Sequence, residues 1–291
     1  MELMNTESIA NGPTVTIRLK KFFNGHFLDT EDILAIEEPL EIRLSYGPSG
    51  NRKVSNVSVT MRTPGSDEEL ATGFLFTEGI ISNRDQISKV EHLFIACREN
   101  KQNTILVNLH ENAIPKLPEI ERSFYTTSSC GVCGKGSIEA IRTVGPPRKE
   151  DIELFQIDSG TLIALPEKLR AAQNVFRKTG GLHACAFFDS DGKLLLVRED
   201  VGRHNALDKL IGAGLEKRKV PMDDGILLLS GRASFELIQK AVMAGIKIVV
   251  AVGAPSSLAV ELSKEFNITL IGFMREDRFN IYSSPERIIF E

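Results

Sequence analysis

The residues best suited to chemistry in this chain are two closely spaced cysteines. The stretch Thr126–Ser137, TTSSCGVCGKGS, contains Cys130 and Cys133, which are two of the four cysteines in the protein. A pair at this spacing can bind zinc, exchange a dithiol for a disulfide, or carry a transferable sulfur on a reactive thiolate. The surrounding sequence has to decide among these three kinds of chemistry.

Zinc is the least favoured of the three. A structural zinc site normally takes four Cys or His ligands, often as two close pairs. The other two cysteines, Cys97 and Cys185, stand singly among strand-like residues, and the spacing of His183 to Cys185 is not a known zinc pattern. We therefore predict no metal ligands.

The remaining choice is between dithiol exchange and sulfur carriage. A thioredoxin-type pair lies at a strand-to-helix junction, whereas this pair follows a proline-containing segment and lies among glycines. Lys135 supplies a cation that favours a thiolate, and the nearby glycines permit close approach of backbone N–H groups. The context favours a thiolate on a movable loop, and dithiol exchange stays open.

Composition narrows the class of protein. The chain has 291 residues, a formal net charge of -4 and no tryptophan, so neither a basic field nor a base-stacking platform indicates nucleic acid. The N-terminal residues lack the order of a signal peptide, and the longest apolar runs are too short to span a membrane. We expect a cytoplasmic protein without membrane partners, in which thiols stay reduced.

The elements that must position these residues differ between the two halves. Residues 1–125 are predicted to form an α+β domain, with strands at 15–22, 39–47 and 103–110 chosen by their alternating pattern. Between them, Ser66 and Glu69 fit a capping box at the start of a helix that Gly79 can end. The paired cysteines would lie at the start of a second domain, residues 126–291.

The second half alternates strands and helices. Residues 183–200 predict a hairpin that turns at Asp191 and Gly192, and residues 166–181 and 203–214 predict helices. Short apolar strands at 225–231, 246–253 and 268–273 are separated by helical segments at 234–245 and 257–266. Continuous apolar strands between helices predict a mostly parallel sheet with helices on its faces.

Small and polar residues follow the three apolar strands. The segments GRAS at 231–234, GAPSS at 253–257 and MREDR at 274–278 begin where those strands end. Ligands of open parallel sheets bind beyond the carboxyl ends of the strands, and helix N-termini attract anions. With Arg232, Arg275 and Arg278 added, this edge is predicted to bind an anionic ligand that carries phosphate.

Two neighbouring features have ordinary explanations. The polar segment REDVGRHNALDKL at 198–210 is typical of a solvated helix start with local ion pairs. His183 stands alone after two glycines, and by itself indicates a hydrogen-bonded structural histidine.

Together, the motifs resemble those of the FdhD family, the formate dehydrogenase accessory sulfurtransferases, from about Pro39 to the C-terminus. The motifs that carry this resemblance are EPLEIRL, TPGSDEELATGFLFTEGII, SSCGVCGKGSIEAI, TGGLHACAFF, REDVGRHNALDKLIG, LLSGRASFELIQKAVMAGI and GAPSSLAVELSKEFNITLIGFMREDRFNIY.

The resemblance implies a fold and a function. It implies a cytidine-deaminase-like, three-layer C-terminal domain and a homodimer. It also implies a persulfide carrier that receives sulfur from a cysteine desulfurase on the paired-cysteine loop. The acceptor would be the molybdenum bis-guanine-dinucleotide cofactor of formate dehydrogenase, with guanosine diphosphate (GDP) as a fragment ligand.

Mapped by motif, the resemblance assigns Cys130 as the persulfide carrier and Cys133 as its partner. The candidate cofactor-binding residues are Phe273, Met274, Arg275, Glu276, Asp277, Arg278, His183, Gly231 and Arg232. Metal-dependent deamination is not expected, because His183 is followed by Ala184 and Cys185 rather than by the Glu of an H-x-E motif. A cofactor-binding chaperone without sulfur transfer and a dithiol oxidoreductase are the alternative functions.

Overall fold

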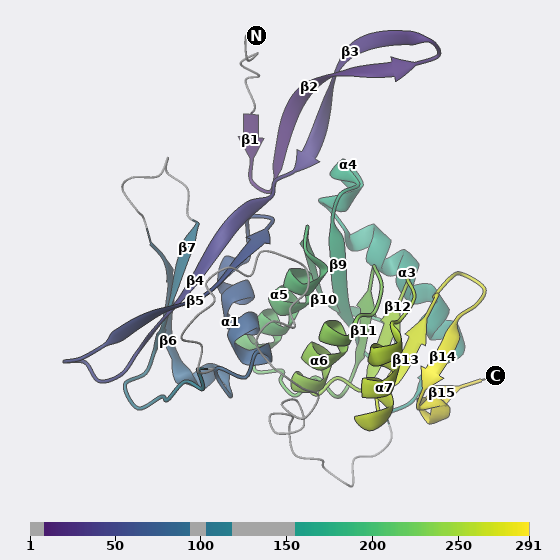
Figure 1. Ribbon diagram of the computed structural model, residues 1–291. Helices are drawn as coiled ribbons and strands as arrows, with labels where there is room; N and C mark the ends of the chain where they lie inside the picture. The colour runs from purple at the N-terminus through teal and green to yellow at the C-terminus, as the bar shows by residue number, and fades with distance from the viewer. Residues whose placement is uncertain (1–8, 94–102, 118–154, 291) are drawn as a thin grey trace.

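The structure is a computed structural model that describes residues 9–93, 103–117 and 155–290 of the 291-residue chain. Two β-sheets with helices between and beside them form the body, and a hairpin stands away from it (Figure 1). The paired cysteines and Cys97 lie outside the described residues. No helix in the described ranges is long and apolar enough to cross a membrane.

The hairpin is the first element of the chain. Strands β2 (Thr14–Phe23) and β3 (His26–Ala35) pair antiparallel over ten residues each, and short β1 (Ile9–Asn11) adds to β2 at the base. The alternating pattern at 15–22 correctly predicted β2. It did not predict the partner strand, because the charges within β3 mask its alternation.

A four-stranded sheet follows. Its strands, in spatial order, are β5 (Lys53–Arg62), β4 (Glu38–Tyr46), β7 (Thr104–Leu109) and β6 (Ile87–His92). The 3₁₀ turn η1 (Arg84–Gln86) precedes β6. The strands predicted at 39–47 and 103–110 are confirmed as β4 and β7.

Helix α1 (Asp67–Thr77) lies against this sheet and ends before Gly79, which has a positive φ of 69° as expected. The predicted capping box is wrong, because the Ser66 side chain makes no cap hydrogen bond. The Glu69 carboxylate instead pairs with the Arg198 guanidinium, which lies far along the sequence. A tertiary ion pair of Glu69 thus replaces the local hydrogen bonds of the predicted capping box.

The second sheet has six strands. In spatial order they are β10 (Leu194–Asp200), β9 (His183–Phe188), β11 (Ile226–Leu229), β12 (Ile248–Ala251), β13 (Thr269–Gly272) and β14 (Asn280–Ser283). Only the β11–β12 and β12–β13 pairings are parallel, so the expectation of a mostly parallel sheet is corrected to a mixed sheet. The tight turn between β9 and β10 forces antiparallel pairing there, as the predicted hairpin requires.

Helices cover both faces of this sheet. Side chains of β9 and β11 alternate between a core shared with α5 (Arg203–Glu216), α6 (Phe235–Met243) and α7 (Ser257–Glu265) and a core shared with α3 (Ser159–Ala172). The remaining elements are α4 (Phe176–Thr179), β8 (Ile157–Asp158), η2 (Pro285–Arg287) and β15 (Ile288–Ile289). This arrangement has three layers.

The helix predicted at 166–181 is two helices. α3 starts at Ser159, where Asp158 accepts a hydrogen bond from the Thr161 N–H at 2.8 Å, so Pro166 lies inside the helix. Helix α3 ends at Ala172, and a separate short helix, α4, begins at Phe176. Gly180 ends that turn at φ 66°, as expected.

The halves on either side of the cysteine segment share one core. α1 crosses α5 so closely that a Cβ added at Gly73 would lie 1.9 Å from the Asp208 carbonyl oxygen. A Cβ at Gly212 would lie 1.9 Å from the Glu69 carbonyl oxygen. Glycine is required at both positions by close backbone approach. The predicted domain boundary near residue 125 lies outside the described residues and stays a prediction.

Candidate functional site

Three turns meet at the carboxyl ends of β11, β12 and β13. The Gly253 N–H donates to the Gly231 carbonyl at 2.9 Å, and the Phe273 N–H donates to the Gly253 carbonyl at 3.1 Å. An additional parallel bridge joins Ala233 to Pro255. The parallel order β11–β12–β13 therefore brings the three polar segments noted in the sequence side by side.

Small residues let the side chains of this edge approach one another. A Cβ at Gly231 would lie 3.2 Å from His183 Nδ1, and a Cβ at Gly253 would lie 2.9 Å from Arg232 Cγ. His183, at the start of β9, and Arg232 thus border the same pair of glycine-containing turns. The structure brings together three of the predicted residues, His183, Gly231 and Arg232.

The His183 imidazole is half-buried and favours its neutral form. Desolvation lowers its pKa, the positive charge of Arg203 lowers it further, and the Asp200 carboxylate acts in the opposite direction. At neutral pH the ring can therefore offer one donor and one acceptor.

A second histidine, His204, lies beside this group in the first turn of α5. Its Nε2 is 3.3 Å from Ser234 Oγ and 3.3 Å from a Glu236 carboxylate oxygen. Burial lowers the pKa of His204 to about 3, helped by the positive charges of Arg203 and Lys240 and, when it is protonated, of His183. Despite the nearby carboxylate, the imidazole is neutral at neutral pH.

Ser234 has an unusual role for a residue at the start of a helix. It precedes α6 in the N-cap position, yet its side chain makes no cap hydrogen bond, and its hydroxyl meets His204 instead. The first N–H groups of α6 therefore lack the side-chain acceptor that an N-cap serine usually supplies. This end of α6 keeps its attraction for an anion.

Arg203 adds positive charge at the same place. Its Nε is buried and has no hydrogen-bond partner among the described residues. Arg203 is also the first residue of α5, where the helix dipole disfavours a cation. An anionic ligand would compensate both effects.

The segment FMREDR at 273–278 contains one buried residue, Met274, and five exposed ones. Phe273 is left-handed at φ 53° and 43% exposed, whereas the Met274 side chain is only 1% exposed and packs in the core. The Arg275 guanidinium donates to the carbonyls of Val252 at 2.8 Å and Met274 at 2.7 Å. Arg275 thus fastens the turn to the neighbouring strand end, and the Met274 side chain packs in the core.

The rest of that segment is exposed. The Arg275 N–H donates to the Arg278 carbonyl at 2.9 Å, which closes a turn that presents Glu276 and Asp277. Arg278 also borders a separate hollow of about 680 Å³ beside β14 and the start of α3. The remaining residues that line the hollow are Ser159, Ile163, Phe279, Asn280, Ile281 and Phe290.

Most of the polar segment 198–210 is structural, but the expected solvated helix start with local ion pairs is corrected, because much of the segment is buried and several of its partners lie far away in the sequence. Asp200 is completely buried, and it accepts from the Thr63 N–H at 3.1 Å and pairs with Lys209 Nζ at 2.7 Å. Asn205 donates to the Met61 carbonyl at 2.7 Å. The sequence analysis missed the roles of Arg203 and His204 at the site, and their position directly after a strand is the signal that could have identified them.

Cys185 is excluded as a reactive thiol. It is free, buried and packed in the core. Burial raises the pKa of its thiol, and the carboxylates of Asp208 and Asp200 raise it further. Within the described ranges, no group of three or more His, Cys, Asp or Glu side chains is arranged to hold a metal ion.

The fold and this edge define a class: a mixed α/β protein with a polar, anion-attracting group at the carboxyl ends of parallel strands. The chain belongs to the FdhD/NarQ family, whose family model matches residues 35–289. Relatives named "Sulfur carrier protein FdhD" extend over nearly the whole chain. One from Mycolicibacterium paratuberculosis is 49% identical over 91% of this chain and 94% of its own length.

Two further comparisons agree. A relative of the same name from Sulfolobus acidocaldarius is 40% identical over 94% of this chain and 97% of its own length. The crystal structure of a putative formate dehydrogenase accessory protein from Desulfotalea psychrophila matches with a TM-score of 0.70 and 24% identity. It covers 95% of this chain and 99% of the other. That likeness confirms a mixed α/β fold.

Proposed function

We propose that the protein is a sulfur carrier that supports formate dehydrogenase, acting as a sulfurtransferase through Cys130 and Cys133. The observation that carries this proposal is the near-complete coverage of relatives named sulfur carrier protein, one of them at 49% identity. The paired-cysteine segment and its adjacent Lys135 supply the residues that the chemistry needs.

In the first step, the Cys130 thiolate attacks the terminal sulfur of a persulfide on a cysteine desulfurase. A new S–S bond forms at Cys130, the donor S–S bond breaks, and the donor cysteine leaves as a thiolate. In the second step, Cys133 can attack the Cys130 sulfur. A Cys130–Cys133 disulfide then forms and the persulfide S–S bond breaks. The outer sulfur leaves as hydrosulfide, so the two cysteine sulfurs are oxidised and the transferred sulfur is reduced.

The acceptor in this proposal is the molybdenum bis-guanine-dinucleotide cofactor, for which GDP is a convenient fragment. Arg203, Arg232 and the two neutral histidines support the proposal, because they form a group suited to phosphate at the strand ends. The proposal also includes the cytidine-deaminase-like character of the fold, a homodimer and a cytoplasmic location.

The test is mass spectrometry of the full chain after incubation with cysteine desulfurase and cysteine. We expect the mass of an added sulfur on Cys130, and its loss in Cys130→Ala. Cys185→Ala is the matched control, because burial keeps that thiol protonated, and it should accept sulfur as the parent does. Separate assays of Cys133→Ala would distinguish a resolving thiol from one that only tunes its partner.

Two results would overturn the proposal in favour of other functions. If the double variant Cys130→Ala with Cys133→Ala still yields active formate dehydrogenase, the protein is a cofactor chaperone. If the pair instead cycles through a reversible disulfide without any desulfurase, it is a dithiol oxidoreductase.

A further inference from the structure

Ser234, the residue before α6, behaves differently from the serine before the neighbouring helix α7 (Figure 1). Ser256 precedes α7 with φ −82° and ψ 159°, and Ser234 has nearly the same angles, φ −92° and ψ 164°. The Ser256 hydroxyl accepts a hydrogen bond from the Ala259 N–H at 3.2 Å, whereas the Ser234 hydroxyl makes no such bond to α6. Since the backbones match, the difference lies in the side chains around Ser234.

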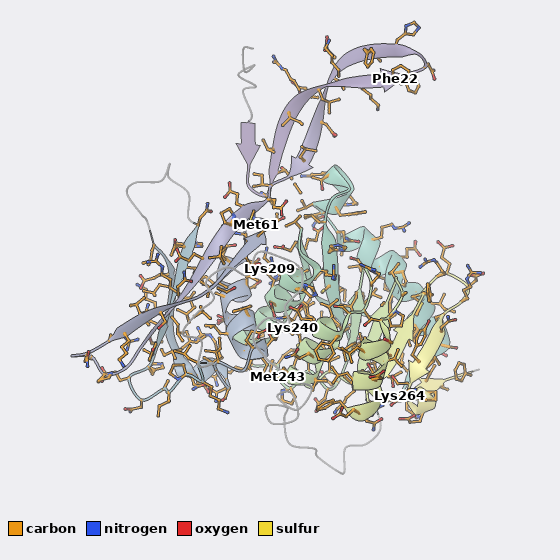
Figure 2. The ribbon with its side chains drawn as sticks, viewed as in Figure 1. Phe22, Met61, Lys209, Lys240, Met243 and Lys264 are labelled. Carbon is orange, nitrogen blue, oxygen red and sulfur yellow. The ribbon has the colours of Figure 1, made fainter. Side chains whose placement is uncertain are left out.

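The side chain that diverts Ser234 is His204, in the first turn of α5. His204 Nε2 lies 3.3 Å from Ser234 Oγ and 3.3 Å from a Glu236 carboxylate oxygen. The ring is neutral at neutral pH, so it has a single N–H, on either Nδ1 or Nε2. The Glu236 carboxylate can only accept, and its negative charge also acts on Lys240 of α6 (Figure 2). The hydrogen of His204 therefore belongs on Nε2, where it faces both oxygens.

This tautomer decides what the Ser234 hydroxyl can do. Its oxygen accepts from the His204 Nε2–H, so its own hydrogen is not used in that contact. Among the described residues, no acceptor takes that hydrogen. Ser234 is partly exposed, so the acceptor can come from outside the chain. Glu236 thus orients His204, and His204 orients a hydroxyl donor.

The charges around Ser234 favour an anionic acceptor. Arg203 is close enough for its positive charge to lower the pKa of His204, and its Nε is buried with no partner among the described residues. The Glu236 carboxylate acts against an anion, but the Lys240 cation lies nearby and offsets it. Hydrogen bonds to an ionised acceptor are the strong ones, so a phosphate oxygen suits this donor.

We propose that Ser234 is a ligand-contact residue of the strand-end site, and that its hydroxyl donates to an anionic oxygen of a phosphate-bearing ligand. His204 and Glu236 act through it as positioning residues, because they hold the hydroxyl oxygen and leave its hydrogen for the ligand. The inference rests on the phosphate-bearing ligand of the proposed function. It adds the residue that recognises this phosphate and the two that orient it.

The test is a double-mutant cycle on GDP binding to the full chain, measured by calorimetry. Ser234→Ala removes the hydroxyl, and His204→Leu fills the same space without an N–H. Each should weaken GDP binding by about 10-fold, as expected for one charge-assisted hydrogen bond. The double variant should bind no more weakly than either single variant, because both changes remove the same bond. His204→Gln places an amide N–H near the position of Nε2, so it should bind GDP more tightly than His204→Leu does.

Two further ligands show which part of GDP the hydroxyl contacts. Ser234→Ala should weaken the binding of inorganic pyrophosphate as it weakens that of GDP, and should leave the binding of guanosine unchanged. Ser88→Ala is the matched control, because Ser88 is an exposed serine of β6 whose hydroxyl donates to the Asn108 carbonyl at 2.9 Å. This control should bind all three ligands as the parent does.

Nitrogen-15 NMR of the histidine rings tests the orientation without any ligand. At neutral pH, His204 should be the Nε2–H tautomer in the parent protein. Circular dichroism should show each variant folded. If His204→Leu does not fold, the tautomer and Ser234→Ala still decide the question.

An Nδ1–H tautomer, an unchanged GDP affinity in Ser234→Ala, or additive effects of the two changes would each overturn the inference. A loss seen only with guanosine would also overturn it, since the hydroxyl would then contact the base. Persulfide formation on Cys130 is measured separately. If Ser234 and His204 prove coupled but no persulfide forms, sulfur transfer fails and the inference stands. If persulfide forms but the parent binds neither GDP nor pyrophosphate, the inference fails and sulfur transfer stands.

Discussion

The two histidines at the strand ends, His183 and His204, are both neutral at neutral pH. The pKa of His204 is the one that is lowered by a large amount. Its pKa falls from 6.5 to about 3, chiefly through burial. Between these two values the unfolded chain binds a proton that the folded chain rejects. Acidification through this window therefore favours unfolding.

We predict that His204 makes the protein less stable as the pH falls from neutral to about 4, by up to about 1.4 kcal/mol per pH unit. His204→Gln keeps a donor near Glu236 but cannot titrate, so its stability should depend less steeply on pH. Urea unfolding of both proteins across this range measures the difference. Identical pH profiles would show that His204 accepts a proton in the folded state.

Arg203 is the residue through which the site is expected to hold phosphate. Its Nε is buried without a partner among the described residues, and charge-assisted hydrogen bonds are the strong ones. We predict that Arg203→Gln weakens GDP binding by about 10- to 100-fold, measured by calorimetry. Arg170→Gln, an exposed change on α3, should bind GDP as the parent does. Unchanged affinity in Arg203→Gln would remove Arg203 from the site.

The types of the residues alone did not predict the roles of the side chains at the strand ends, because each role depends on neighbours in the folded structure. The sequence marked Met274 and Arg275 as candidate cofactor-binding residues, which stays a prediction; the structure adds that the Met274 side chain is buried and that Arg275 Nη1 donates to two carbonyls. His204 was assigned to an ordinary helix start, because its partner Ser234 lies thirty positions away. Such partners depend on tertiary packing, which local spacing does not encode.

At the scale of elements, the crossing of α1 and α5 depends on glycine. A Cβ at Gly73 would meet backbone atoms of Asp208 and Gly212, which cannot move aside as a flexible side chain can. We predict that Gly73→Ala lowers the free energy of unfolding by about 3 kcal/mol. Gly50→Ala is the control, because a Cβ there meets nothing within 4 Å and its φ is ordinary. Equal stability of the two variants in urea would mean that the helices can separate without cost.

The elements that sequence predicted best are those whose environment is uniform. β11, β12 and β13 are covered by helices on both faces, so each is continuously apolar and could be recognised. The hairpin at Asp191 and Gly192 carried its own turn signal. β3 was missed and the helix at 166–181 was joined across a break, because charge pairing and a tertiary contact override the local pattern there.

On the scale of the whole molecule, hydrogen bonds from two buried lysines connect the regions on both sides of the cysteine segment. Lys209 Nζ donates to the Thr63 carbonyl at 2.8 Å, and Lys240 Nζ donates to Thr77 Oγ1 at 3.0 Å. Both lysine side chains are about 2% exposed. Figure 2 shows where they lie. A surface between independent domains is usually more hydrated, so the described regions should unfold together.

The last prediction tests this coupling through Lys240, which lies 3.0 Å from the buried Asp208 carboxylate. Burial raises the pKa of Asp208 to about 6 even with Lys240 nearby. Lys240→Met removes that cation and should cost about 3 kcal/mol of stability. Calorimetry should show one transition at a lower midpoint, whereas the exposed Lys264→Met should barely move it. A separate early transition in Lys240→Met would mean that the two halves unfold independently, because a shared core cannot lose one side alone.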